Sequence, residues 1–138
     1  MAREVVFVAL GSNVGDRDGH LAFARQRLAG LPETEFRAES SVEETAPIGP
    51  VCQEPYLNQM VLLESALHPD VLLDACLAIE KDRGRERGER WGPRTLDLDI
   101  VRFGNRSIRT SRLTVPHPEL PHREFWQREL AELAVHVG

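Results

Sequence analysis

Strand-like and helix-like segments alternate along this 138-residue chain, and their order restricts the folds that it can adopt. The apolar, β-branched run from Val5 to Leu10 is typical of a buried strand. Asp16 is then a good helix N-cap, and Leu21 and Leu28 follow it at roughly helical spacing. The same criteria predict strands over 3–10, 34–45, 56–67 and 96–103, and helices between Asp16 and Gly30, over 70–81 with Pro69 in the first turn, and over 124–135.

This order, β-α-β-β-α-β followed by a C-terminal helix, predicts an α+β fold. Two βαβ halves of this kind form a ferredoxin-like sandwich, in which helices pack on one face of an antiparallel sheet. No repeat or linker interrupts residues 1–138, so we expect a single domain. Two long loops, 45–55 and 82–94, precede strands. Loops of this length inside a compact domain are usually functional, and these two could close over one region of the molecule.

Composition narrows the class of protein. Hydrophobic residues make up 41% of the chain and charged residues 28%, which is ordinary for a soluble globular protein. The longest apolar run is far shorter than the roughly 20 residues that cross a bilayer, and the N-terminus lacks a signal-peptide pattern. Cys52 and Cys76 form neither a C-x-x-C pair nor a metal-binding spacing. We therefore expect a cytoplasmic protein with reduced thiols and no membrane partner.

The charge is unevenly distributed. The net charge of −5 argues against a protein that coats nucleic acid, yet six of the 17 basic residues lie between Lys81 and Arg94. An arginine-dense loop with glycines suits the oxygens of a polyphosphate, although a solvated loop balanced by its own acids is the alternative. Trp91 in this loop favours the first interpretation, because an indole can stack on a heterocyclic substrate.

A strand with paired carboxylates follows this loop. In Leu96-Asp97-Leu98-Asp99-Ile100, alternation directs the three apolar side chains toward a core and both aspartates outward, about 6.6 Å apart along the strand. Carboxylates on a rigid strand, with room for water and substrate phosphate, are a common way to hold Mg²⁺. A solvated strand face is the alternative when the motif is taken alone.

Three weaker signals lie elsewhere. Gly11-Ser12-Asn13 lies between a strand and a helix, where backbone N–H groups can bind an anion, but a plain turn and cap is the preferred interpretation. Tyr56 and Asn58 share a strand face and could hold a flat heterocycle, or the tyrosine could belong to the core. His117 is flanked by prolines, and neither it nor His122 has a partner at zinc spacing.

Together these segments resemble the 6-hydroxymethyl-7,8-dihydropterin pyrophosphokinase family of folate biosynthesis. The densest match is E-R-W-G-P-R-T-L-D-L-D-I over residues 89–100. A-L-G-S-N at 9–13, T-A-P-I-G-P at 45–50, Y-L-N at 56–58 and L-T-V-P-H-P at 113–118 also match. The resemblance covers the chain from Val5 to about Phe125 and implies a ferredoxin-like α+β fold.

The resemblance implies a reaction in which the hydroxymethyl oxygen of the pterin attacks the β-phosphorus of ATP and AMP leaves. Asp97 and Asp99 would hold two Mg²⁺ ions that bridge the ATP phosphates, and Glu80 matches a family carboxylate near the site. Residues implied to act in catalysis besides these aspartates are Arg85, Arg94 and His117. Further residues implied to bind ATP are Arg87, Trp91, Ile100, Arg112, Thr114 and Arg123.

The resemblance also implies a pterin site. Tyr56 and Phe125 match the two rings that enclose the pterin, and Asn58 matches its hydrogen-bonding partner. Thr45 and Ile48 lie in the loop whose backbone completes this site. The expected partners are thus ATP and 6-hydroxymethyl-7,8-dihydropterin, with neither nucleic acid nor membrane.

The chain departs from the family pattern near its end. Family members commonly read F-V-L-x-P-L where this chain has F-W-Q-R-E-L over residues 125–130, so Glu129 occupies the usual proline position. This departure predicts an altered C-terminal helix. It also leaves an alternative, namely that the chain is a catalytically impaired relative that still binds nucleotide. An RNA-recognition domain of the same fold is the second alternative, but the chain lacks the aromatic strand motif of that class.

Overall fold

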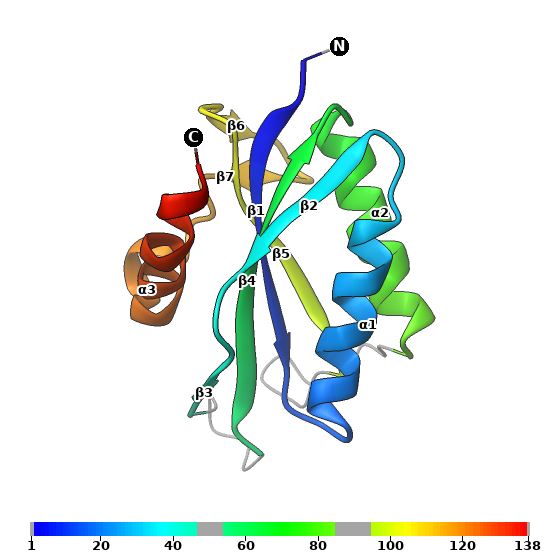
Figure 1. The fold of residues 1–138 in the computed structure, drawn as a ribbon, viewed down its shortest axis with the longest axis vertical. Helices are drawn as coiled ribbons and strands as arrows, with labels where there is room; N and C mark the ends of the chain where they lie inside the picture. Colours follow the sequence, from blue (N-terminus) through cyan, green and yellow to red (C-terminus); the bar gives the residue numbers. More distant parts are fainter. Residues whose placement is uncertain (1, 47–53, 85–94, 138) are drawn as a thin grey trace.

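A five-stranded antiparallel sheet forms the centre of the molecule (Figure 1). The structure is a computed structural model, and it describes residues 2–46, 54–84 and 95–137. The main strand order is β2-β4-β1-β5, and the short β3 pairs with β4. The strand bounds are β1 Glu4–Ser12, β2 Thr34–Glu39, β3 Glu43–Thr45, β4 Tyr56–Ser65 and β5 Asp97–Phe103. The predicted α+β fold with an antiparallel sheet is therefore confirmed.

Helices cover both faces of this sheet. α1 (Arg17–Ala29) and α2 (Pro69–Asp82) lie side by side on one face, as the predicted sandwich requires, whereas α3 (Glu124–Leu133) lies on the other (Figure 1). The predicted caps are present, since the Asp16 carboxylate accepts the Gly19 N–H at 3.0 Å and α2 begins at Pro69.

The two sheet faces bury two apolar clusters. Every second residue of the central strand β1 belongs to the cluster under α1 and α2. The residues between them belong to the cluster under α3. From β1 these are Val6, Val8 and Leu10 for the first cluster, and Val5, Phe7 and Ala9 for the second. β1 has neighbours on both sides and helices above and below, which is why its sequence reads as an unbroken apolar run.

Two parts of the chain differ from the predicted elements. The strand predicted over 34–45 divides into β2 and β3 at residues 40–42, where the Ser40 hydroxyl, in place of a backbone carbonyl, accepts the Met60 N–H, and Val42 is exposed. A small ribbon, β6 (Ile108–Arg109) with β7 (Thr114–Val115), and two short 3-10 turns, Leu120–His122 and Ala134–His136, were not predicted. Elements of two or three residues are too short to show a hydrophobic period.

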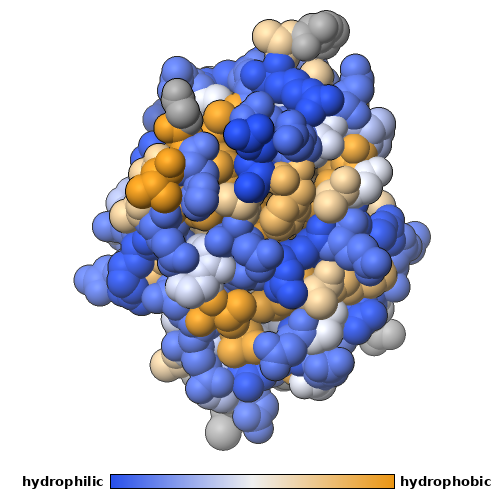
Figure 2. All heavy atoms as spheres, viewed as in Figure 1, coloured by the Kyte–Doolittle hydropathy of each residue, from blue (hydrophilic) through white to orange (hydrophobic). Residues whose placement is uncertain are grey.

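The polar character of the surface and the state of Cys76 agree with what the composition predicts for a globular protein with reduced thiols. On the face in Figure 2, apolar residues form small patches among hydrophilic ones, a pattern normal for exposed apolar residues. Cys76 is free and buried, and burial raises the pKa of its thiol to about 12, so the thiol stays protonated. No helix within the described residues has the length and apolar character that crossing a membrane requires.

Candidate functional site

The candidate site is assembled by strand register on the sheet face that also carries α3. Asp97 of β5 lies opposite Gly11 of β1, Gly11 lies opposite Asn58 of β4, and Asn58 lies opposite Glu43 of β3. Residues that face one another across antiparallel strands point to the same side of the sheet. Four segments far apart in the sequence therefore place one row of side chains on a common surface.

The two aspartates occupy this surface as the alternation predicts. Leu98 and Ile100 are buried beneath α2, whereas Asp97 and Asp99 point to the opposite face and are half-exposed. Their neighbours on β1 are Gly11 and Ala9, whose small size leaves space beside the carboxylates. Carboxylate oxygens are the type of ligand that Mg²⁺ prefers. The described side chains thus fit the expected cation.

His117 lies beside Asp99 in a defined orientation. Its backbone N–H donates to Val101 O at 2.9 Å, and its Nδ1 accepts the Glu119 N–H at 3.0 Å. This contact assigns the proton of the neutral ring to Nε2, which lies 3.8 Å from Asp99 Oδ1. Burial, and then the charge of Arg123, lower the pKa of His117. The ring therefore presents a neutral N–H donor beside the carboxylate.

A tryptophan that the sequence analysis did not select joins His117 to the start of α3. The ring centroids of His117 and Trp126 are 4.9 Å apart and nearly perpendicular. Arg123 Cζ lies 4.4 Å from the Trp126 ring centroid, and the Phe125 ring lies edge-on to Trp126 at 6.2 Å. The helical spacing of Trp126, Leu130 and Leu133 is the signal that marks this residue as inward-facing.

The residues expected to bind the pterin gather on β3 and β4. Asn58 Nδ2 donates to Thr45 Oγ1 at 2.6 Å, and Tyr56 lies opposite Thr45 in the strand register. Tyr56 is only partly buried, so it is not a core tyrosine. A Cβ atom on Gly11 would lie 3.5 Å from Asn58 Oδ1, which places that glycine on the floor between Asn58 and the aspartates.

The remaining predicted residues are not among the side chains that these contacts bring together. The Ile100 side chain is buried on the opposite face, so only its backbone can reach the site. Arg112 pairs with Asp74 of α2, which raises the pKa of the guanidinium, and Thr114 lies in β7 opposite Arg109. Five predicted residues lie outside the described part of the chain, namely Ile48, Arg85, Arg87, Trp91 and Arg94.

Two buried acids, one on each side of the sheet, contact residues next to the site. Glu80 Oε2 accepts the Leu98 N–H at 2.7 Å, between the two aspartates of β5. Glu129 of α3 is 1% exposed, and its carboxyl faces Glu43, the residue opposite Asn58. The sequence analysis identified Glu129 only as a departure from the family pattern.

The turn after β1 has a structural partner. Asn13 Nδ2 donates to Glu54 O at 3.3 Å, and Arg17 Nη1 donates to Pro55 O at 2.8 Å. These bonds tie the start of α1 to the segment that enters β4. Gly11 and Ser12 themselves continue β1, so the turn predicted over Gly11-Ser12-Asn13 begins only at Asn13.

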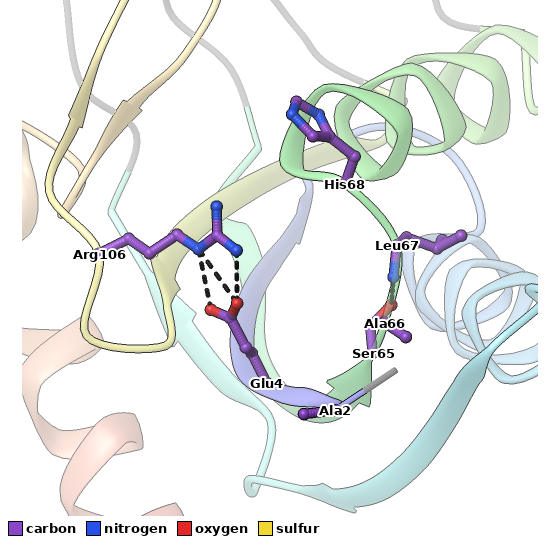
Figure 3. A pocket seen from close by; sticks show the side chains of 7 residues that line it. All are labelled: Ala2, Glu4, Ser65, Ala66, Leu67, His68 and Arg106. Carbon is purple, nitrogen blue, oxygen red and sulfur yellow. Dashed lines mark hydrogen bonds and ion pairs between the residues drawn. The ribbon is translucent and has the colours of Figure 1, made fainter.

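A small hollow lies at the opposite end of the sheet (Figure 3). It has a volume of about 140 Å³, and Arg106 crosses it to form hydrogen bonds with both oxygens of Glu4. Its other lining residues are Ala2, Ser65, Ala66, Leu67 and His68. Glu4 and Gly11 are separated by seven residues of strand, roughly 23 Å, so this hollow is distinct from the candidate site.

Comparison with known proteins identifies the family of the chain. Residues 7–135 match the family model described as 7,8-dihydro-6-hydroxymethylpterin-pyrophosphokinase. The chain is similar to the 2-amino-4-hydroxy-6-hydroxymethyldihydropteridine pyrophosphokinases of Bacillus subtilis and Pseudomonas aeruginosa. Identity is 41% over 96% of this chain and 80% of the Bacillus protein, and 43% over 94% of this chain and 80% of the Pseudomonas protein. The chain therefore belongs to the 7,8-dihydro-6-hydroxymethylpterin-pyrophosphokinase family, transferases of folate biosynthesis.

Proposed function

We propose that this chain transfers the β,γ-pyrophosphoryl group of ATP to 6-hydroxymethyl-7,8-dihydropterin and releases AMP. The hydroxymethyl oxygen forms a bond to the β-phosphorus, the bond from that phosphorus to the α,β-bridging oxygen breaks, and the hydroxyl proton is released. Family membership supports the reaction class. The observation that carries the assignment to these residues is the row across the sheet that places Asp97 and Asn58 on either side of Gly11.

In this proposal, Asp97 and Asp99 would hold the two Mg²⁺ ions that accompany ATP. Bound there, Mg²⁺ neutralises phosphate charge and aligns the attacking and leaving oxygens. Asp97 and Asp99 lie on one strand face, so both carboxylates are already on the same side of the sheet. This removes part of the ordering cost of binding.

The phosphate oxygens are bound by donors around His117 in this proposal. His117 offers a neutral Nε2–H, and Arg123 offers a guanidinium at the start of α3. The donors assigned from the family resemblance are Arg85 and Arg94, with Arg87, Trp91, Arg112, Thr114 and the Ile100 backbone as helpers. Donors directed at oxygens that gain charge in the transition state lower the barrier most.

The pterin is bound by the side chains at the end of β4. Asn58 has both a donor and an acceptor and is held by Thr45, so it presents a fixed hydrogen-bonding edge. Tyr56 and Phe125 are assigned to the two ring faces, and the backbone near Thr45 and Ile48 to the remaining polar edge. A flat heterocycle requires this combination of stacking and edge recognition.

We also propose that residues 1–138 act as one cytoplasmic domain, without nucleic acid or membrane as a partner. The net charge of −5 and the absence of a long apolar run in the sequence support this assignment.

The decisive experiment is an incubation with Mg-ATP and 6-hydroxymethyl-7,8-dihydropterin, followed by chromatography of the nucleotides. We expect AMP and pterin diphosphate in equal amounts. Asp97→Asn should lower kcat by at least about 100-fold, the size of a lost transition-state contact, whereas the exposed control Asp18→Asn should retain it. ADP in place of AMP would contradict pyrophosphoryl transfer, and ATP binding without turnover would identify an impaired relative.

A further inference from the structure

Three residues of the proposed site share one contact. His117 comes from the segment after β7, Arg123 is the N-cap residue of α3, and Phe125 lies in the first turn of that helix. Each ring or guanidinium lies against the indole of Trp126, with separations of 4.9, 4.4 and 6.2 Å respectively. The three side chains therefore depend on the position of one ring.

Trp126 is itself held by the core. It is 2% exposed and belongs to the apolar cluster under α3, with Ala9, Met60, Leu62 and Val101 of the sheet. Closely packed interiors leave a large side chain little freedom. Because the ring is buried, it does not bind substrate. Packing on the sheet fixes the ring, and the ring in turn restricts the three residues that touch it.

Arg123 has a particular need for this ring. It lies at the N-terminus of α3, where the helix dipole disfavours a positive charge, and its side chain makes no capping hydrogen bond. Its Nε is buried and has no hydrogen-bond partner within the described ranges. The guanidinium instead lies over the Trp126 ring at cation–π distance. The aromatic face thus compensates for an unfavourable location of the charge.

We propose that Trp126 is a positioning residue, which fixes His117 and Arg123 for the nucleotide and Phe125 for the pterin. This inference rests on the proposed function of those three residues. It requires an aromatic ring at position 126, since a merely apolar side chain fills the core but provides no π face for the guanidinium.

The test compares Trp126→Phe with Trp126→Leu. We expect Trp126→Leu to lower kcat/KM for ATP at least tenfold and Trp126→Phe to stay within about threefold of the unmodified chain, because phenylalanine keeps a ring for Arg123. The matched control is Leu133→Ala, which opens the same apolar cluster on the same helix without touching the site. Leu133→Ala should lower the Tm while leaving kcat and KM of the folded enzyme unchanged.

A double-mutant cycle separates positioning from packing. In an Arg123→Ala background, Trp126→Leu should cost much less in kcat/KM for ATP than it does alone, because its action through Arg123 is already lost. Should Trp126→Leu fail to fold, Trp126→Met takes its place in both comparisons. Equal kinetics for the Phe and Leu variants, or full additivity with Arg123→Ala, would overturn the proposal.

Failure of the proposed function gives a different result. It would appear as the absence of AMP from the unmodified chain. Calorimetric titration with Mg-ATP would then still rank the Trp126 variants by affinity. A ranking in which Phe and Leu variants bind Mg-ATP equally would overturn the positioning role by itself.

Discussion

Glu129 is a buried acid that cannot ionise at neutral pH without cost. Burial, and then the adjacent Glu43, raise the pKa of its carboxyl to about 9. As carboxylates, Glu129 and Glu43 can only accept hydrogen bonds, and three of their four oxygens then lack a donor among the described residues. A proton on Glu129 lets it donate to Glu43, while Arg128 Nε holds the fourth oxygen at 3.0 Å. Glu129 is therefore neutral in the folded chain.

This neutral acid predicts a decline of stability with pH. The folded-state pKa lies above the ordinary value of 4.5, so the folded chain binds the extra proton between these values, and unfolding becomes easier as pH rises through this window. Glu129→Gln keeps a neutral donor and removes the titration. From pH 6 to pH 8, the unmodified chain should lose up to about 2.7 kcal/mol more unfolding free energy than this variant, as measured with urea.

The matched control is Glu124→Gln. Glu124 lies in the first turn of the same helix, but it is exposed and does not contribute to the raised pKa of Glu129. Its pH dependence should follow that of the unmodified chain. Parallel curves for Glu129→Gln and the unmodified chain would show that Glu129 is ionised when folded.

At the scale of elements, a residue of α2 supplies a hydrogen-bond acceptor for the outer edge of β5. β5 is the last strand of the sheet, so every second N–H of its backbone points away from β1. The Leu98 N–H is buried there and donates to Glu80, which lies in the last turns of α2 and is 5% exposed. This bond lies between the two aspartates, so helix and strand together determine their spacing.

Removing this acceptor should affect both stability and the cation. Glu80→Ala leaves the Leu98 N–H unpaired and should lower the free energy of unfolding by about 1–3 kcal/mol. It should also raise the Mg²⁺ concentration needed for half-maximal activity. Glu80→Gln retains an acceptor oxygen and should recover most of both properties. An unchanged Mg²⁺ requirement in folded Glu80→Ala protein would contradict the link between α2 and the aspartates.

At the scale of the molecule, the two ends of the sheet carry different groups of residues. One end carries the aspartates and the residues of β3 and β4, and the other carries the Glu4–Arg106 pair beside the N-terminus (Figure 3). The strands between them are buried on both faces and form a rigid connection. Changes at the two ends should therefore act independently.

Thermal unfolding measures this independence. Mg-ATP at 100 times its Kd should stabilise the chain by about 2.7 kcal/mol, and EDTA should abolish the effect. Arg106→Ala loses the hydrogen bonds to Glu4 and should lower the Tm without changing the shift that Mg-ATP produces. A smaller ligand-induced shift in Arg106→Ala would show that the two ends are coupled.

Most of the secondary structure could be predicted from local patterns in the sequence. The alternation around Asp97 and Asp99 predicted correctly which side chains are buried, because a strand with one packed face must repeat with period two. Asp16 and Pro69 predicted the helix starts for equally local reasons. The resemblance was carried by contiguous motifs, which need no tertiary information.

The contacts between these parts could not be predicted from local patterns. The row from Asp97 through Gly11 and Asn58 to Glu43 depends on strand register, which long-range pairing sets. The placement of α3 opposite the other helices brings Trp126 against His117 and Glu129 against Glu43. Local patterns reveal that a side chain faces inward, but not which residue it meets. The contacts across chain-distant segments therefore had to come from the fold.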